Sequence, residues 1–192
     1  MKNLQVRIKT DLTTEPVSAT EAKLWCKVTG TAEDSMFTIM ISAARQALEK
    51  YTASSFAEKT IHATWISMPD DNELELPYGP VISVDHVYKI DEEGTEEELT
   101  LNTDFWVFGD QDAIIKISTL WSSNVVSERS VRVEYTAGYG NAATETLPAK
   151  LKECILMLIA KAYVNRGDGA PLVVLDNEIK REAAAYRKQL WF

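Results

Sequence analysis

The sequence predicts an α+β fold, in which a small helical bundle of about four helices is interrupted by an antiparallel β insertion. Two segments with helical periodicity lie toward the two ends of the chain, and short segments rich in β-branched and aromatic residues lie between them. The chain has 192 residues, of which 45% are hydrophobic, so it can bury a core in one domain that carries an insertion. We expect an N-terminal arm over residues 1–16, a helical domain over residues 17–55 plus 140–192, and an inserted β module over residues 56–139.

The clearest helical segment covers residues 147–163. Pro148 suits the first turn of a helix, where an N–H would have no intrahelical partner, and Gly167 follows the expected end. Between them, apolar residues recur at steps of three and four, which is the pattern of a buried helix face. This face consists of Leu151, Cys154, Ile155, Leu158, Ile159, Ala162 and Tyr163.

Two further helices are expected before the β module. The capping box of residues 18–21 (Ser-Ala-Thr-Glu) predicts a short helix that runs through Cys26. Asp34 is placed to cap a second helix. The apolar stripe of that helix is Phe37, Ile41, Ala44, Leu48 and Tyr51, and its opposite, polar face is Arg45, Glu49 and Lys50. We expect this stripe to pack against the face of the helix at residues 147–163.

A last helix is expected to begin at Asp176 or Asn177 and to continue through Ile179, Ala183, Tyr186 and Leu190. Two aromatic residues, Trp191 and Phe192, then end the chain. They either fold back onto the core of the protein or anchor it in a neighbouring chain, because aromatic residues are enriched at interface hot spots. The candidate partner-binding residues are Tyr186, Arg187, Leu190, Trp191 and Phe192.

The middle of the chain contains short β-like segments separated by turn signals. They cover residues 60–66, 81–84 with 87–88, 104–108, 113–117 and 131–135. Five or more strands at this spacing predict an antiparallel module. Residues 4–8 alternate weakly between apolar and polar, which is consistent with either an arm or an edge strand.

The charge of the chain limits its partners. It carries 29 acidic and 20 basic residues, a formal net charge of −9, which disfavours strong sequence-independent binding to nucleic-acid phosphates. Residues 1–9 lack the apolar stretch of a signal peptide, and no apolar run has the length of a membrane span. We therefore expect a soluble, intracellular protein that does not bind membranes.

Residues that carry catalysis are mostly missing. His62 and His86 fall in expected strands, with no cysteine or carboxylate cluster beside either at metal-ligand spacing. Cys26 and Cys154 lie on apolar helix faces and are expected to be buried free thiols. The sequence therefore predicts no catalytic, cofactor or metal site, and a binding or assembly protein rather than an enzyme.

One acidic run stands out, formed around Gly94 by Asp91, Glu92, Glu93, Glu96, Glu97 and Glu98. One interpretation is a solvated hairpin tip, whose self-repulsion prevents pairing of the sheet edge. The other is an acidic patch that meets a basic partner or lines a passage. Cation binding is the third, although the run lacks the alternating ligand order of a calcium loop.

Several of these segments, in this order, resemble the phage head–tail connector family, the adaptor or head-completion proteins of long-tailed phages and prophages. The resemblance begins with the Ser-capped short helix at residues 16–23, the acidic turn, and the helix that ends at residues 47–52 (Ala-Leu-Glu-Lys-Tyr-Thr). It continues through residues 76–84 of the β module. Residues 135–139, followed by residues 147–152 and the helix end at residues 163–166, complete it.

The resemblance implies a structural virion protein without cofactors. Family members form a ring, typically dodecameric, under the portal, extend the DNA channel, and present a docking surface to the next connector or tail-completion protein. DNA would pass through this channel without specific binding. The implied location is the head–tail junction of the virion, after assembly in the host cytoplasm. We expect the last helix, with Trp191 and Phe192, to contact the portal.

Two other interpretations remain open. The first is a monomeric interaction module that binds a partner along a β-edge. The second is an enzyme whose active site is built from scattered carboxylates, which would require a deep pocket that gathers several of them. A stable monomer with an exposed strand would favour the module, and a self-assembling chain would favour the connector.

Overall fold

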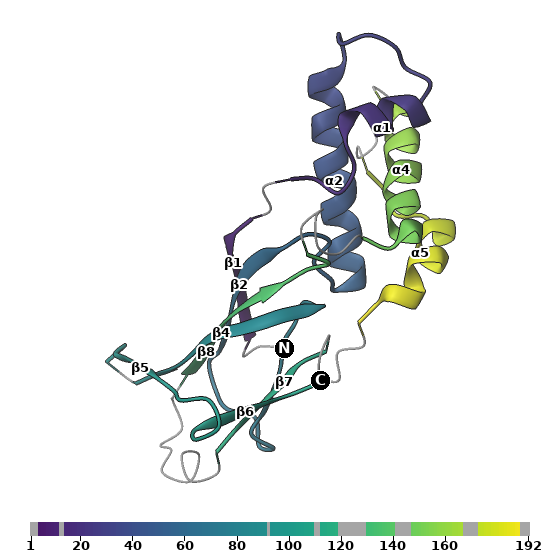
Figure 1. Cartoon of the computed structure of the whole chain (residues 1–192). Helices are drawn as coiled ribbons and strands as arrows, with labels where there is room; N and C mark the ends of the chain where they lie inside the picture. Colours follow the sequence, from purple (N-terminus) through teal and green to yellow (C-terminus); the bar gives the residue numbers. More distant parts are fainter. Residues whose placement is uncertain are drawn as a thin grey trace. The chain divides into compact units, whose positions relative to one another are not determined.

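The computed structural model describes residues 4–11, 14–91, 93–109, 112–118, 130–140, 147–166 and 173–188 (Figure 1). The chain divides into two compact units. One is a β unit of residues 1–11, 58–138 and 188–192, and the other is a helical unit of residues 12–57 and 139–187. The fold is therefore a mixed α+β fold, as predicted. Within the described residues, no helix is both long enough and apolar enough to span a bilayer.

Four α-helices and one 3-10 turn form the described part of the helical unit. They are α1 (Ala19–Trp25), α2 (Asp34–Thr52), α4 (Ala149–Val164), α5 (Asn177–Ala183) and η1 (Ala184–Tyr186). The predicted faces of α2 and α4 meet in one core, which α1 and α5 complete. The fully buried side chains of this core include Phe37, Met40, Leu48, Leu151 and Ile155. The pairing of α2 with α4 confirms the prediction from their apolar periodicity.

The helix starts differ in how well the sequence predicted them. Ser18 caps α1 as expected, because its hydroxyl accepts from the Glu21 N–H and the Glu21 carboxylate accepts from the Ser18 N–H. The expectation that Asp34 caps α2 was wrong. Glu33 is the N-cap residue of α2, and the Asp34 carboxylate instead pairs with Lys23 at 2.5 Å. The Asp34 carboxylate therefore binds the ammonium of Lys23 on α1 rather than the backbone N–H groups at the start of α2.

The polar face predicted for α2 was also partly wrong. Arg45 and Glu49 are only 2% and 6% exposed, whereas Lys50 is exposed as expected. Arg45 donates from Nη1 to Glu49 Oε2 at 2.7 Å and from Nε to Glu15 Oε2 at 2.7 Å. The second oxygen of Glu49 accepts from the Phe56 N–H at 2.8 Å. This cluster links the chain before α1 to α2 and to the segment that follows α2. Each buried charge in it has a partner, which offsets the cost of removing that charge from water.

The C-terminal helix is shorter than predicted. Asp176 caps α5 by accepting from the Ile179 N–H at 2.9 Å, but the α-helix ends at Ala183 and a single 3-10 turn follows. Ile179 and Ala183 are buried as expected. Leu190 lies outside the described residues.

The β unit contains two sheets. The strands are β1 (Leu4–Thr10), β2 (Lys59–Trp65), β3 (Glu73–Glu75), β4 (Val81–Ile90), β5 (Glu96–Glu98), β6 (Phe105–Phe108), β7 (Ile114–Ile117) and β8 (Ser130–Ala137). A five-stranded sheet has the order β1-β2-β8-β4-β5, and a three-stranded sheet has the order β3-β7-β6. All pairings between these strands are antiparallel, as predicted. Of the two options for residues 4–8, the structure has the edge strand.

Buried and less buried side chains alternate along β2 and along much of β8, and the buried ones form the core of the β unit, between its two sheets. In β2 every second residue is buried, and the matching residues of β8 are buried with them. Ile61, Ala63, Val131, Val133 and Tyr135 contribute to this core. The opposite face of the five-stranded sheet carries polar side chains, so the two faces of this sheet have different roles.

Candidate functional site

The acidic run forms the turn after β4 and then strand β5, at one edge of the five-stranded sheet. Asp91 holds the turn, because its carboxylate accepts from the backbone N–H groups of Thr95 and Glu93 at 2.7 and 3.1 Å. The bond from Thr95 is the largest of the effects that lower the pKa of Asp91. Glu92 lies outside the described residues. The run thus forms a hairpin whose strand β5 pairs with β4 and ends the five-stranded sheet, so its outer edge is the one that the self-repulsion interpretation concerns, and that interpretation stays a prediction.

Each glutamate of β5 has a basic partner on β4 or, across β4, on β8. Glu96 forms a two-pronged pair with Arg132 of β8, in which Nη2 and Oε2 are 2.6 Å apart. Glu97 pairs with Lys89 at 2.9 Å, and Glu98 lies 2.6 Å from Nδ1 of His86. The negative charge of β5 is therefore compensated locally, by Lys89 and His86 on the adjacent strand β4 and by Arg132 on β8, the next strand along the sheet. Among the described residues, the uncompensated carboxylates of the run are Asp91 and Glu93.

The two histidines share the polar face of the five-stranded sheet with Glu134. The register places His62 of β2 and His86 of β4 on either side of Glu134 of β8. His62 Nε2 is 3.0 Å from Glu134 Oε2, and Lys9 of β1 pairs with the other oxygen. Burial opposes ionisation of Glu134, but the hydrogen bonds from Lys9 and His62 outweigh it and lower the pKa of this carboxyl. The sequence did not predict these partners, because they come from strands far apart in the chain.

We expect His86 to titrate above the ordinary histidine value of about 6.5. The hydrogen bond that the His86 ring donates to the Glu98 carboxylate is the largest cause of the raised pKa of His86. Because the folded-state pKa is raised, this pair stabilises the fold fully below the unfolded value and loses its contribution as pH rises through the folded value. An NMR titration of the His86 ring measures this midpoint. Glu98→Gln should lower it toward the ordinary value, and an unchanged midpoint in that variant would contradict the assignment.

No catalytic or metal site is found in the described part of the chain. It contains no group of three or more histidine, cysteine, aspartate or glutamate side chains that could hold a metal ion. Cys154 is buried in α4, and Cys26 is half-buried at the end of α1. Burial raises the pKa of both thiols, so both are expected to stay protonated and unreactive near neutral pH.

Two of the five candidate partner-binding residues lie in the described part of the C-terminus. Tyr186 packs against the helical core, and its carbonyl accepts from the Ser54 hydroxyl at 3.4 Å. Arg187 is exposed, and its guanidinium lies over the ring of Tyr51, 5.6 Å from the centroid. Arg187 is thus the more accessible of the two. Leu190, Trp191 and Phe192 fall outside the described residues.

The chain after Arg187 is anchored in the β unit. The ammonium of Lys188 donates to the Leu76 carbonyl at 2.7 Å and lies 3.3 Å from Asp112. The Lys188 side chain is almost completely buried by these contacts. The last described residue is therefore held in the β unit by its side chain.

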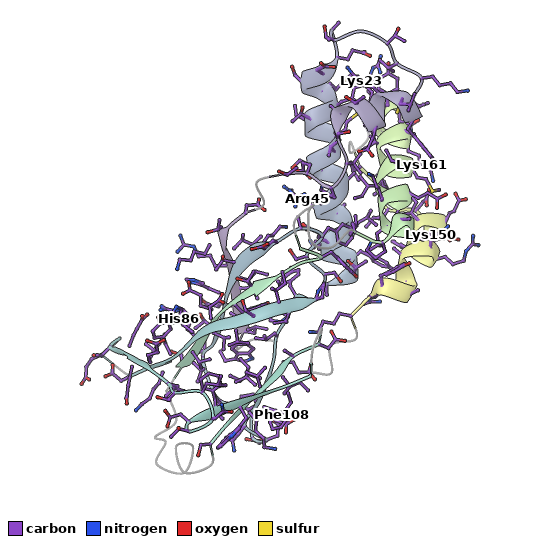
Figure 2. The ribbon with its side chains drawn as sticks, in the orientation of Figure 1. Lys23, Arg45, His86, Phe108, Lys150 and Lys161 are labelled. Carbon is purple, nitrogen blue, oxygen red and sulfur yellow. The ribbon has the colours of Figure 1, made fainter. Side chains whose placement is uncertain are left out.

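One end of the helical unit carries exposed apolar side chains that the sequence did not single out. Leu24 and Val164 are each 78% exposed, and Trp25, the last residue of α1, is 46% exposed. Ion pairs bring these helix ends together, since Lys23 binds Asp34 and Arg166 binds Glu33 at 3.1 Å. We call Leu24, Trp25 and Val164 the apolar end of the helical unit; Lys23, labelled in Figure 2, is the residue before Leu24 on α1. Exposed apolar side chains at one end of a unit are a candidate interaction surface.

Comparisons with known proteins agree with the resemblance seen in the sequence. Residues 18–104 match the model of a family described as phage gp6-like head-tail connector protein. This confirms the resemblance over that segment, which covers the helices α1 and α2 and the first part of the β unit. The matching family is one of connector proteins rather than enzymes. No protein in the curated set matches this chain.

The whole chain shares its fold with proteins in the necks of gene transfer agent (GTA) particles. A chain in the neck of the empty GTA particle, computed with C6 symmetry, aligns with a TM-score of 0.76 at 20% identity, covering 98% of this chain and 97% of the other. A chain from the virion of the native gene transfer agent particle aligns with a TM-score of 0.73 at 18% identity, with the same coverage. A chain in the neck of the native particle, computed with C12 symmetry, gives 0.62 at 19% identity, again with the same coverage.

Proposed function

We propose that this chain, which matches the phage gp6-like head-tail connector family over residues 18–104, is a structural virion protein that assembles as a ring at the junction of head and tail. The observation that carries the proposal is the agreement between that match and a shared fold that extends over 98% of the chain. The C6 and C12 symmetries named for the similar neck structures support a ring.

In this role the ring lies under the portal, extends the DNA channel, and provides the docking surface for the next connector or tail component. The formal charge of −9 supports passage of DNA without specific binding, because a negative wall repels phosphates. Of the acidic run, Asp91 and Glu93 are the better candidates for such a wall, since Glu96, Glu97 and Glu98 have basic partners. Assembly of the ring takes place in the host cytoplasm.

A ring needs heterologous contacts, in which one face of a subunit meets a different face of the next. The apolar end of the helical unit is our candidate for one of these faces, because it exposes Leu24 and Val164 strongly. Burial of such exposed apolar residues against a neighbouring subunit lowers the free energy of the assembly, because it removes apolar surface from water. The second face is expected to lie on the outer side of α2 or on the β unit.

The mass of the protein in solution tests the proposal. Light scattering over a concentration series, alone and mixed with the portal protein, should reveal a ring-sized species that forms alone or only with the portal. Replacing Leu24 and Val164 by aspartate should reduce this species strongly, whereas aspartate at exposed Lys50 should not. A monomer at every concentration that also ignores the portal would contradict the connector proposal and favour a module that binds along a β-edge.

The C-terminus is proposed to contact the portal through Arg187, Leu190, Trp191 and Phe192, with half-buried Tyr186 at the base of this segment. Deleting residues 189–192 should weaken portal binding by about tenfold or more, because aromatic anchors commonly dominate interface energies. The deletion keeps Lys188 and its bonds to Leu76 and Asp112, so the fold should remain. A pull-down with immobilised portal measures the effect. Undiminished binding would refute the assignment.

A further inference from the structure

The β unit contains a groove bordered by two strands with free edges. It has a volume of about 670 Å³ and is lined by the first part of β4, by the segment after β5 and by β6; His86, which is labelled in Figure 2, is one of the lining residues. Its apolar lining includes Val81, Val84, Leu99, Leu101, Phe105 and Val107. The groove shares Glu98 and His86 with the acidic run and its partners, and its other lining residues lie outside the candidate surfaces described above.

The edge of β4 that faces the groove is open along residues 81–86. β4 pairs with β8 from Val81 to Ile90, with register shifts between Val81 and Ser83 and between Val84 and His86. Its other edge is covered by β5 at Tyr88, Lys89 and Ile90, and the Leu99 N–H donates to the Val87 carbonyl at 2.8 Å. Among the described residues, no strand pairs with that edge before this point. Extended residues rise about 3.3 Å each, so the open edge is about 20 Å long. Such an edge presents backbone N–H and C=O groups that can pair with another strand.

The edge of β6 on the other side is also largely open. β6 is the outer strand of the three-stranded sheet and pairs with β7. On its other side, an isolated bridge joins Leu101 and Phe105, and the Asn102 N–H donates to the Phe105 carbonyl at 2.8 Å. In the part of the chain that the structure describes, residues 106–108 have no strand partner on that side, so apolar side chains and backbone groups border the same groove.

The charge at the groove selects the kind of strand that fits. Of the residues that line it, Asp85 and Glu98 are acidic, and none is lysine or arginine. Glu98 is paired with His86, whereas the Asp85 carboxylate accepts from the hydroxyls of Ser83 and Thr136 at 2.7 and 2.9 Å. In the described part of the chain, the partners of the Asp85 carboxylate are thus uncharged hydroxyls, and the carboxylate lies next to the apolar lining of the groove. An apolar side chain suits the channel, and a basic side chain beside it suits the rim.

We infer that this groove binds an extended segment of a partner protein in which apolar and basic residues alternate, and that the segment adds a strand to the open edge of β4. Backbone hydrogen bonds to residues 81–86 supply affinity, and the alternating side chains supply specificity. The inference goes beyond the proposed connector function, because the groove exists within one β unit and does not depend on a ring.

The test uses the full chain, labelled with ¹⁵N, and the synthetic peptide acetyl-Val-Lys-Val-Arg-Val-Lys-Val-amide. We expect peptide addition to shift the amide signals of residues 81–86 and to leave those of β1 unchanged. A peptide with glutamate at each basic position should bind about tenfold more weakly, as expected when like charges meet. Asp85→Lys should reverse this preference between the two peptides.

Two variants on β6 form a matched pair. Val107 lines the groove and Trp106 does not, although both are 36% exposed. Val107→Lys should weaken peptide binding by about tenfold or more, the loss typical of a central contact, while Trp106→Lys should change it less than about threefold. Circular dichroism confirms that both variants fold.

Several results would overturn the inference. They are an absence of shifts in β4, shifts in β1 instead, or equal binding by Val107→Lys and the unaltered chain. If the peptide does not bind but Val107→Lys abolishes self-association, the occupant is a second copy of the chain and the inference is wrong. Because the ring is measured by mass and the groove by peptide binding, either proposal can fail without the other.

Discussion

Replacing Arg45 with alanine is expected to lower the free energy of unfolding by about 3–5 kcal/mol, the usual cost of removing one partner from a buried ion pair. The Arg45 side chain is nearly inaccessible to water and donates to both Glu15 and Glu49. Without the guanidinium, the buried Glu49 carboxylate loses its ion pair and keeps the bond from the Phe56 N–H. A charge that is buried and poorly compensated is costly.

Chemical denaturation, followed by far-UV circular dichroism, measures the loss. Lys50→Ala on the same helix is the control, because Lys50 is exposed and its change should stay within about 0.5 kcal/mol. Glu15→Ala should cost less than Arg45→Ala, since the Glu15 side chain is partly exposed and Glu49 retains its pair. Equal losses in Arg45→Ala and Lys50→Ala would show that the cluster does not stabilise the helical unit.

Phe37→Ala is also expected to lower the free energy of unfolding by about 3–5 kcal/mol, here because a buried aromatic side chain is truncated. Phe37 is fully buried between α2 and α4, and its ring stacks on Tyr163 with centroids 5.2 Å apart. Truncation removes the apolar contact area and leaves a cavity that the helices cannot close completely.

The control for Phe37 is Ile39→Ala, two positions along the same helix and 62% exposed. It should leave stability within about 0.5 kcal/mol, because little area is buried there and alanine favours helix. The same denaturation measurement serves both variants. A small loss for Phe37→Ala would mean that the contact between α2 and α4 contributes little to the stability of the helical unit.

The secondary structure was predictable where one period dominated. The faces of α2 and α4 follow directly from apolar residues at steps of three and four, and the strands follow from their β-branched and aromatic residues. Arg45 and Glu49 were misplaced because a charged residue in a helix is normally on the solvent face. The tertiary contact with Glu15, thirty residues away from Arg45, helps to offset the free-energy cost of burying these charges, and the local sequence does not reveal it.

The candidate sites were harder to predict than the fold. The acidic run was visible in the sequence, but its partners Arg132, Lys89 and His86 depend on strand register, which brings β8 and β4 beside it. The groove is formed by parts of β4, β6 and the segment between β5 and β6. A local sequence pattern does not predict this groove, because its lining residues come from separate segments that only the folded sheets bring together.

The division of the helical unit between residues 12–57 and 139–187 has a consequence for synthesis of the chain. The ribosome completes the eight strands of the described residues before it reaches α4, so the β unit can form its sheets while α2 still lacks its partner. At roughly 5–20 residues per second, the apolar stripe of α2 waits several seconds for the α4 face. During that interval the nascent chain exposes the apolar stripe of α2 to solvent. Chaperones that bind exposed apolar segments are expected to bind it then.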